Sequence, residues 1–288
     1  MPPNQPDVCE ILHGRAARTA EFRHTRIEPP TPTWTRGEAP DLMKTGRLVL
    51  LGTGTCRLEP RRSTSAVLIE LGELRWVFDF GRGTALRLVE LGLHQDDVSH
   101  IVLSHFHTDH WSDLLPYLQA ASHSPSDPRR TDLHIHASSA VIAKLYALFA
   151  LFGPDELIVE KHFRVHLHAI TTGTSRIGGH EFAFVHLPPA GNHGLRFETR
   201  ETVCALTGDS HFHQQEIDFL RGADLAVIDA GHLTDEEIVV LAAASEVSRL
   251  VCSHLYREID GDRLNRLATD RGYRGRLLVG SDLQSFQL

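Results

Sequence analysis

The stretch VLSHFHTDHWSD, residues 102–113, contains the side chains best suited to chemistry in this sequence. His105, His107, Asp109 and His110 follow a short apolar run, where a strand ends and side chains two apart can converge. Neutral imidazoles and a carboxylate are suitable ligands for zinc, manganese or iron. A second metal ion about 3.5 to 4 Å away would let a bridging hydroxide form near neutral pH. We therefore interpret the stretch as part of a metal site rather than as a histidine-rich surface patch.

Later apolar runs end in further metal-ligating residues, which a six-residue motif cannot provide by itself. The segment ALTGDS ends such a run with Asp209, and its small-residue turn would let the carboxylate bridge two cations. The segment RLVCSHLYRE ends another run with His254. Taken alone, Asp209 would fit an ordinary turn and His254 a histidine of the core. Together with the first motif, they predict the second half of a two-metal site.

Short apolar runs typical of β-strands precede these motifs and recur along the chain. A helix is predicted over residues 83–93, because Leu86, Val89 and Leu93 recur at helical spacing and Gly92 can end it. The other predicted helices occupy residues 139–153 and 234–247, and the predicted strands occupy residues 47–52, 65–71, 75–81, 99–105, 132–138, 162–170, 180–187, 194–199, 202–210, 223–230 and 248–254.

The order of these elements predicts the fold class. Antiparallel strands are followed by strand and helix units, and the second half of the chain echoes the first. This pattern favours an α/β fold of the αββα type, a four-layer sandwich of two mixed sheets with outer helices. Residues 1–45 are polar, contain prolines and have weak periodicity. We predict that they form a partly irregular N-terminal extension to a domain spanning residues 46–288.

Composition limits the functional classes. The net charge of -8 and the pI near 6.2 argue against a generally basic face for binding nucleic acid. The four cysteines include no CxxC pair, which fits reduced thiols in a cytoplasmic protein and leaves imidazole and carboxylate as metal ligands. No stretch matches an export signal or a membrane span. We predict a cytoplasmic protein that does not associate with membranes.

At these motifs the chain resembles the metallo-β-lactamase fold superfamily, in the branch of tRNase Z and of arylsulfatase-like and phosphodiesterase-like hydrolases. The segment LGTGTCRLEPRRSTSAVLIE is similar to the opening strand and loop of that branch, and VFDFGRGTALRLVELGL is similar to its next segment. LSHFHTDH carries the metal motif, TGDS the bridging aspartate, and GHLT with LVCSHLYR the last histidine region. The resemblance covers roughly residues 46–260, and only the HxHxDH motif is specific by itself.

The resemblance implies two divalent metal ions, with zinc expected and manganese or iron as alternatives. It implies that His105 and His107 bind the first metal, that Asp109 and His110 bind the second, and that Asp209 bridges the two.

Behind and beside these ligands, the resemblance assigns two more residues. His254 would complete the second metal site. Asp79, in FDFG, matches a position behind the metal-binding loop and would orient a ligand histidine.

One ligand of the first metal stays open between two histidines. His186 keeps the family's His-x-x-Pro start, but it stands two residues further from Gly194 than is usual in tRNase Z. His193 directly precedes that glycine, in a loop that could also face the metals. The sequence does not separate the two, so both are candidate ligands.

Two residues are predicted to take part in catalysis, namely Asp109, besides its role as a ligand, and His232. His232, in DAGHLT, resembles the histidine of the branch's GHST segment and could act as a general acid near the leaving group. The His-Glu-Ala-Thr element that is usual in tRNase Z is replaced here by VIDAG. An equally open role for His232 is to cap the following helix.

The remaining histidine-rich segments are interpreted as structural or solvent-facing. HIH and HLH each place two histidines on one face of a strand, but no carboxylate or turn accompanies them. We therefore leave the following residues out of the metal site: His123, His134, His136, His162, His166 and His168.

The predicted reaction is metal-dependent hydrolysis of a phosphodiester or a related ester, through a hydroxide that bridges the two metals. Residues 111–180 contain no glycine- and proline-rich basic arm of the kind that grips tRNA, and the acidic charge does not favour RNA. The expected partner is a small-molecule or nucleotide ester, and residues 1–45 could support a homodimer. Alternatives are hydrolysis of a sulfate ester or lactone, tRNA 3′ processing, or a non-hydrolytic metal-binding role.

Overall fold

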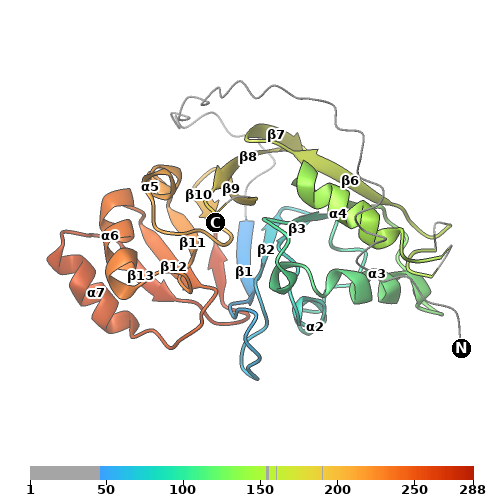
Figure 1. Ribbon diagram of the computed structural model, residues 1–288, viewed down its shortest axis with the longest axis horizontal. Helices are drawn as coiled ribbons and strands as arrows, with labels where there is room; N and C mark the ends of the chain where they lie inside the picture. Colours follow the sequence, from blue (N-terminus) through green and yellow to red (C-terminus); the bar gives the residue numbers. More distant parts are fainter. Residues whose placement is uncertain (1–45, 154–155, 160, 190) are drawn as a thin grey trace, which may run out of the picture. The chain divides into compact units, whose positions relative to one another are not determined.

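Two β-sheets of seven strands each pack face to face in the computed structural model, with helices on the outside (Figure 1). The structure describes residues 46–288, except 154–155, 160 and 190. The predicted N-terminal extension, residues 1–45, lies outside these residues, so the division into extension and domain stays a prediction. Among the described residues, no helix is both long enough and apolar enough to cross a membrane.

The first sheet has an antiparallel and a parallel part. In spatial order its strands are β14 (Ser285–Gln287), β1 (Gly46–Gly52), β2 (Ala66–Leu71), β3 (Leu74–Phe78), β4 (His100–Val102), β5 (Leu133–Ser138) and β6 (Val165–Ile170). Neighbours from β14 to β3 are antiparallel, and neighbours from β3 to β6 are parallel.

The second sheet repeats this division. Its strands are β13 (Arg276–Val279), β12 (Arg249–Ser253), β11 (Leu225–Asp229), β10 (Val203–Leu206), β9 (Asn192–Glu198), β8 (His180–Leu187) and β7 (Gly173–Ile177). Neighbours from β13 to β10 are parallel, and neighbours from β10 to β7 are antiparallel.

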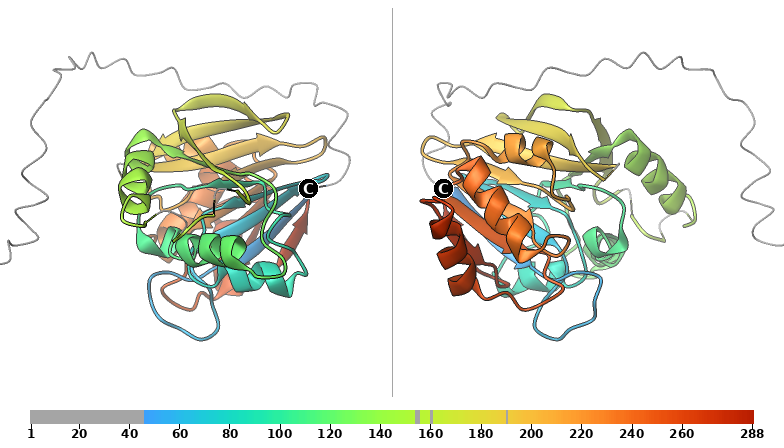
Figure 2. Two further views of the ribbon diagram at one scale, coloured as in Figure 1. Left: turned by 90° about the vertical axis from the view of Figure 1, so that its right-hand side faces the viewer. Right: turned by 60° about the vertical axis from the view of Figure 1, so that its left-hand side comes forward.

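Helices cover the outer face of each sheet, so the predicted αββα sandwich is confirmed (Figure 2). One apolar core joins the first sheet to α2 (Thr84–Glu90), α3 (Leu114–His123) and α4 (Ser139–Phe149). A second joins the other sheet to α5 (Gln214–Leu220), α6 (Asp235–Ser245) and α7 (Gly261–Asp270). A third lies between the sheets, where the ring of Trp76 stacks on that of Phe182 at 4.1 Å between centroids. The helices α3, α5 and α7 and the strands β7, β13 and β14 were not among the predicted elements.

The helix predicted over residues 83–93 is confirmed as α2, but two of the three residues whose spacing predicted it are largely exposed. Leu86 and Val89 are 70% and 68% exposed, whereas Leu88 is buried in the core below the helix. Asp113 accepts a hydrogen bond from the backbone N–H of Ala85 at 3.0 Å and thereby helps to set the rotation of this seven-residue helix. Helical spacing alone did not distinguish between the two faces because both carry apolar residues.

The parallel strands bring their carboxyl ends to one edge of the sandwich, which is where ligands bind in open α/β sheets. Asp79 directly follows β3, and the HxHxDH motif follows β4. Asp209 follows β10, Asp229 is the last residue of β11, and His254 directly follows β12. Five separate segments of chain therefore deliver polar side chains to a common region.

Two histidines are buried between the sheets beside the aromatic pair. The ring of Trp76 stacks on His100 at 4.5 Å and on His136 at 5.7 Å between centroids. Burial, together with the charges of neighbouring histidines, lowers the pKa of His100 to about 4 and the pKa of His136 to about 3. Both rings are therefore neutral in the folded protein at pH 7.

We expect the fold to lose stability in acid because of these two histidines. In the unfolded chain their pKa returns to about 6.5, so below that pH the unfolded state binds protons that the folded state does not. At pH 7.5 these histidines are neutral in both states and hardly change the free energy of unfolding. At pH 5 each histidine should lower the free energy of unfolding by on the order of 1 to 2 kcal/mol. Urea unfolding of the metal-free protein at the two pH values measures this difference.

Between pH 7.5 and pH 5, the free energy of unfolding of the variant His100→Gln/His136→Gln should fall much less than that of the wild type, whatever the stability of the variant at pH 7.5. The half-buried His94, which lies outside the sheets, gives the control, since His94→Gln should keep the wild-type pH dependence. An equal drop in the double variant and the wild type would contradict the explanation.

Candidate metal centre

The loop after β4 presents the predicted metal motif from a tightly turned backbone. Residues Thr108–His110 form a 3-10 helix, which places His110 and Asp109 on the inner side of the turn, where both are buried. His105 is also buried, whereas the side chain of His107 is 71% exposed. The motif therefore has an inner part and one histidine that faces solvent.

Asp79 holds this loop from behind. Its Oδ2 lies 2.7 Å from Nδ1 of His110, and its Oδ1 accepts a hydrogen bond from the backbone N–H of Ser104 at 2.8 Å. Asp79 is fully buried and has a positive φ of 61°, a conformation that non-glycine residues rarely adopt. Gly81, two residues later, allows close approach, because a Cβ there would lie 2.1 Å from the carbonyl oxygen of Asp109. The contact to Nδ1 leaves Nε2 of His110 pointing to the centre.

Three overlapping groups of potential ligands meet here, and in each group the ligand atoms all lie within 4.8 Å of one another. The first group is His105, His107 and Asp209, and the second group is Asp109, His110 and His254. The third group, which shares one residue with each of the other two, is Asp209, Asp229, His232 and His254. The first two groups bring together residues that the family resemblance assigns to the same metal.

Asp209 stands between the first two groups and turns one oxygen to each. Its Oδ2 lies 3.5 Å from Nε2 of His105 and 3.8 Å from Nδ1 of His107. Its Oδ1 lies 2.9 Å from Nε2 of His110 and 3.4 Å from Nε2 of His254. Gly208, with a φ of 63°, makes the turn that brings the carboxylate here after β10. A carboxylate in this position can bridge two cations.

Several atoms at the centre are buried and lack hydrogen-bond partners among the described residues. They are Nε2 of His105, Nε2 of His110 and Oδ1 of Asp209. The last two lie 2.9 Å apart, but the ring N–H is not aligned for a hydrogen bond. Buried polar atoms without partners are costly, and nitrogen and carboxylate oxygen are ligands that divalent transition metals accept. The donor set therefore fits bound metal ions.

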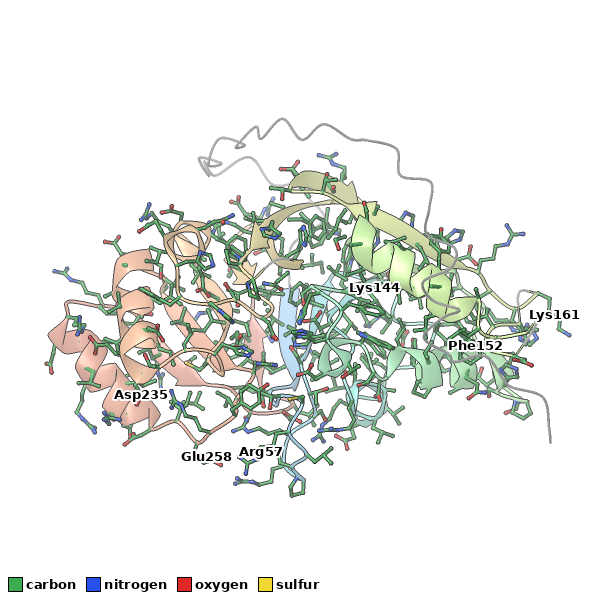
Figure 3. All side chains as sticks on the ribbon, viewed as in Figure 1. Arg57, Lys144, Phe152, Lys161, Asp235 and Glu258 are labelled. Atoms are coloured by element: carbon green, nitrogen blue, oxygen red, sulfur yellow. The ribbon has the colours of Figure 1, made fainter. Side chains whose placement is uncertain are left out.

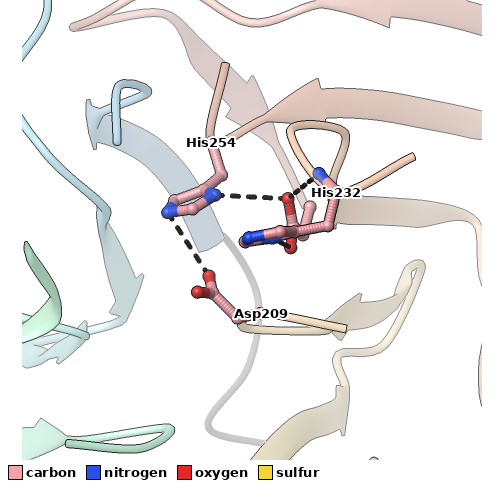
Figure 4. A group of neighbouring side chains, drawn as sticks. Asp209, His232 and His254 are labelled. Carbon is pink, nitrogen blue, oxygen red and sulfur yellow. Dashed lines mark hydrogen bonds and ion pairs between the residues drawn. The ribbon is translucent and has the colours of Figure 1, made fainter. Parts of the chain in front are cut away.

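Asp229 connects the second group to His232. Figure 4 shows His232 beside the ring of His254, with a dashed line from that ring to the carboxylate of Asp209. Oδ1 of Asp229 lies 3.2 Å from Nδ1 of His254, and Oδ2 of Asp229 lies 2.6 Å from Nδ1 of His232. His254 itself has a positive φ of 53°, so this contact holds a strained residue in place. Helix α6 is capped by the Thr234 side chain, which accepts from the N–H of Glu237, so capping is not the role of His232.

Sequence reasoning missed Asp229 as a site residue. The available signal was its position at the end of an apolar strand, the same place that Asp79 and Asp209 occupy in their segments.

The carboxylates make the centre strongly favourable for positive charge. Burial lowers the pKa of His254, but hydrogen bonds to Asp109 and Asp229 outweigh it and raise that pKa to about 9. Burial likewise raises the pKa of Asp209, but the charges of His110 and His254 outweigh it, and the net pKa lies well below its usual range. The field that retains protons on histidines also attracts divalent cations.

The two candidates for the remaining ligand lie opposite each other on β8 and β9. His186 pairs with His193 in the antiparallel register, and their rings meet edge to face at 5.5 Å. Nε2 of His186 accepts a hydrogen bond from the N–H of Gly191 at 3.3 Å. His193 is buried, its backbone N–H donates to the carbonyl of Ser104, and its Nδ1 has no partner among the described residues. Neither side chain belongs to the two groups of three ligands.

An arginine-bearing loop borders the centre on the side of His254. Tyr256 presents its ring edge to His254 and to His232, with 5.6 Å between centroids in both cases. Arg57, in the loop between β1 and β2, donates to the carbonyl of Tyr256 at 3.2 Å and is exposed (Figure 3). Its guanidinium has no carboxylate partner among the described residues. Among the described residues it therefore forms no ion pair, and it lies next to Tyr256, whose ring borders the centre.

Comparisons with known proteins agree with the motif and the fold. A family model, the beta-lactamase superfamily domain, matches residues 77–256, a stretch that includes every predicted site residue. The ribonuclease Z of Mycobacterium sp. strain KMS is 27% identical over 176 residues, which are 57% of this chain and 61% of that protein. This chain thus matches less than two thirds of the length of that relative.

Solved structures share the fold at low sequence identity. The metallo-β-lactamase fold protein YhfI from Bacillus subtilis has a TM-score of 0.71 and 18% identity, and covers 85% of this chain and 100% of its own. Human tRNase Z, short form, has a TM-score of 0.62 and 18% identity, covering 83% of this chain and 98% of its own. A diphosphatase from the PhnP family has a TM-score of 0.62 and 16% identity, covering 85% of this chain and 97% of its own.

We expect Asp79→Asn to weaken metal binding by about 10- to 100-fold, the usual effect of losing a hydrogen-bond partner behind a metal ligand. The amide has only one acceptor oxygen, so it cannot accept from Ser104 and also hold His110 as the carboxylate does. Competition with a chromophoric chelator measures the affinity. Asp260→Asn, which changes the cap of α7 instead, should bind metal like the wild type. Wild-type affinity in a folded Asp79→Asn variant would contradict the role given to Asp79.

Proposed function

The chain belongs to the β-lactamase superfamily, and from this premise we propose that it is a hydrolase of phosphodiesters that depends on two divalent metal ions. The observation that carries the proposal is the position of Asp209, whose two oxygens face two separate groups of histidines. A single buried carboxylate between two ligand groups can bridge two metal ions and hold them at the separation that two-metal hydrolysis uses.

We assign the ligands by the group in which each lies. His105 and His107 would bind the first metal, Asp109, His110 and His254 the second, and Asp209 both. Zinc is the expected metal because imidazole nitrogens outnumber carboxylates, although manganese and iron accept the same ligands.

His193 is our choice for the remaining ligand of the first metal. The residue is buried, its backbone N–H donates to the carbonyl of Ser104, the residue before His105, and its Nδ1 is without a partner among the described residues. Nε2 of His186 is already engaged by the N–H of Gly191. A buried ring nitrogen with no partner is the costlier of the two to leave without a ligand.

Bound metal ions would supply a nucleophile near neutral pH, by lowering the pKa of a coordinated water, and would polarise the phosphoryl group. The chain's own residues would orient the metal ligands and donate a proton to the leaving group. Asp79 and Asp229 hold His110 and His254 from behind through ring nitrogen contacts at 2.7 and 3.2 Å. These two carboxylates therefore set the orientation of the inner ligands.

His232 is placed to donate a proton to the leaving group. Its hydrogen bond to Asp229 raises its pKa above the usual value, so a larger fraction is protonated at neutral pH. Its side chain is 32% exposed, so it can be reached by substrate, unlike the buried His254. Removing its proton leaves an imidazole that Asp229 still orients, ready to be protonated again from solvent.

The substrate class is argued from the surroundings of the centre. His107 and Arg57 are both exposed, and the guanidinium of Arg57, which forms no ion pair among the described residues, can pair with a phosphate oxygen. The relatives named ribonuclease Z and the diphosphatase-like structure are consistent with phosphodiester chemistry. The net charge of -8 favours a small nucleotide ester over a long RNA.

We expect the zinc-loaded protein to hydrolyse bis(p-nitrophenyl) phosphate, and Asp209→Ala to lower kcat by on the order of 100-fold or more, since metal stabilisation of developing charge is worth several kcal/mol. His232→Gln should change this rate little, because p-nitrophenolate leaves without protonation. The same variant should slow a dinucleotide, whose leaving group needs a proton, by about 100-fold.

Release of p-nitrophenolate and of nucleoside measures the two rates, with His94→Gln as a control, because His94 belongs to none of the ligand groups. Absence of turnover on every phosphodiester by the metal-loaded protein would overturn the proposal. If the protein instead hydrolyses p-nitrophenyl sulfate or a lactone, metal-dependent hydrolysis is supported and the phosphodiester is contradicted as the substrate class.

A further inference from the structure

Five histidines outside the two ligand groups gather on the inner face of the first sheet. We call His100, His134, His136, His166 and His168 the histidine array. The strand register places His134 beside His166 and His136 beside His168, and it pairs His100 with His134. Residues two apart on a strand share a face, so the HIH and HLH segments form a rectangle of four imidazoles with His100 at its side.

Within the array, ring nitrogens come in close pairs. Nδ1 of His134 lies 3.0 Å from Nε2 of His168, and Nδ1 of His100 lies 3.1 Å from Nε2 of His136. Neutral rings can make an N–H···N hydrogen bond at this distance. Two nitrogens that bind one metal ion in adjacent positions, each at about 2.1 Å, also stand about 3 Å apart. Each pair therefore has the spacing of a chelate.

The imidazoles of His134 and His168 are available as ligands because they are uncharged at pH 7. Burial and the charges of neighbouring histidines lower the pKa of His134, and likewise that of His168. A neutral imidazole keeps one lone pair, and its N–H proton can move to the other ring nitrogen. Both nitrogens of a pair can then face one cation without net loss of a proton.

The two pairs differ in access. His100 and His136 are buried beside Trp76, whereas His134 is half-buried and His168 is exposed. An ion from solvent therefore reaches the pair His134/His168 first.

A carboxylate accompanies the outer pair, contrary to the expectation from the sequence. Oδ2 of Asp132 lies 2.7 Å from Nε2 of His166, whose ring stacks on His134 at 4.9 Å. Carboxylates in this position fix the orientation of histidines at metal sites.

We propose that His134 and His168 bind a second kind of metal ion, a divalent transition metal that prefers imidazole nitrogen, such as nickel or copper. His166 lies next to the pair, and water would complete the coordination. Among the described residues, groups with three ligand atoms within 4.8 Å occur at the metal centre only, so this is a two-histidine site of lower affinity. The proposal is independent of the proposed hydrolysis.

Nickel uptake by the zinc-loaded protein tests the proposal. The zinc-loaded protein is dialysed to equilibrium against a buffer that contains Ni²⁺, and the protein-free compartment gives the concentration of free nickel. Elemental analysis should then find about one bound nickel per chain, with the zinc content unchanged. The variant His134→Gln/His168→Gln should lose this nickel and keep its zinc. Thermal unfolding of the variant without nickel verifies that it folds.

Two control variants keep the result specific. His136→Gln, which removes a ring of the inner pair, and His94→Gln, which removes a half-buried histidine outside the array, should both retain the nickel. Three outcomes would overturn the proposal, namely no nickel uptake by the wild type, equal uptake by the folded double variant, or nickel gained only as zinc is lost.

Discussion

The interaction on which the candidate site depends is the contact of one buried carboxylate, that of Asp209, with two groups of histidines at once. Each of its oxygens faces a different group, at distances of 2.9 to 3.8 Å. Such a position exists only because the parallel parts of both sheets end at the same edge of the sandwich. The sheets therefore bring together residues that are about 100 to 150 positions apart in the chain, and a turn through Gly208 brings Asp209 to the point where they meet.

Around Asp209, buried carboxylates hold the histidine rings by the nitrogen that faces away from the centre, so the nitrogen that faces the centre stays available. Asp79 contacts His110, and Asp229 contacts His254, each through the ring nitrogen that faces away from the centre. The backbone is left-handed at both Asp79 and His254, a conformation that costs on the order of 1 kcal/mol or more for a non-glycine residue. The hydrogen bonds to buried carboxylates offset that strain. We infer that the strain is retained because it fixes the direction of the ligand nitrogens.

The sequence allowed prediction of the layers and of most of the centre, and the reasons differ between residues. The αββα sandwich followed from the order of apolar runs, and His105 to His110 followed from a motif with strict spacing. Asp209 and His254 could be predicted because each ends an apolar strand. Asp229 ends a strand in the same way but has no motif of its own, so only its contacts with His232 and His254 reveal it. The exposed face of α2 and the carboxylate beside His166 depend on tertiary packing that no local spacing contains.

The most direct test of the account is anomalous diffraction at the zinc edge from crystals grown with zinc. We predict two peaks at the metal centre, one between His105 and His107 and one between Asp109, His110 and His254, with Asp209 in contact with both. The same map would show whether His193 or His186 reaches the first ion. A single peak, or two peaks neither of which touches Asp209, would contradict the central claim that this carboxylate bridges two metal ions.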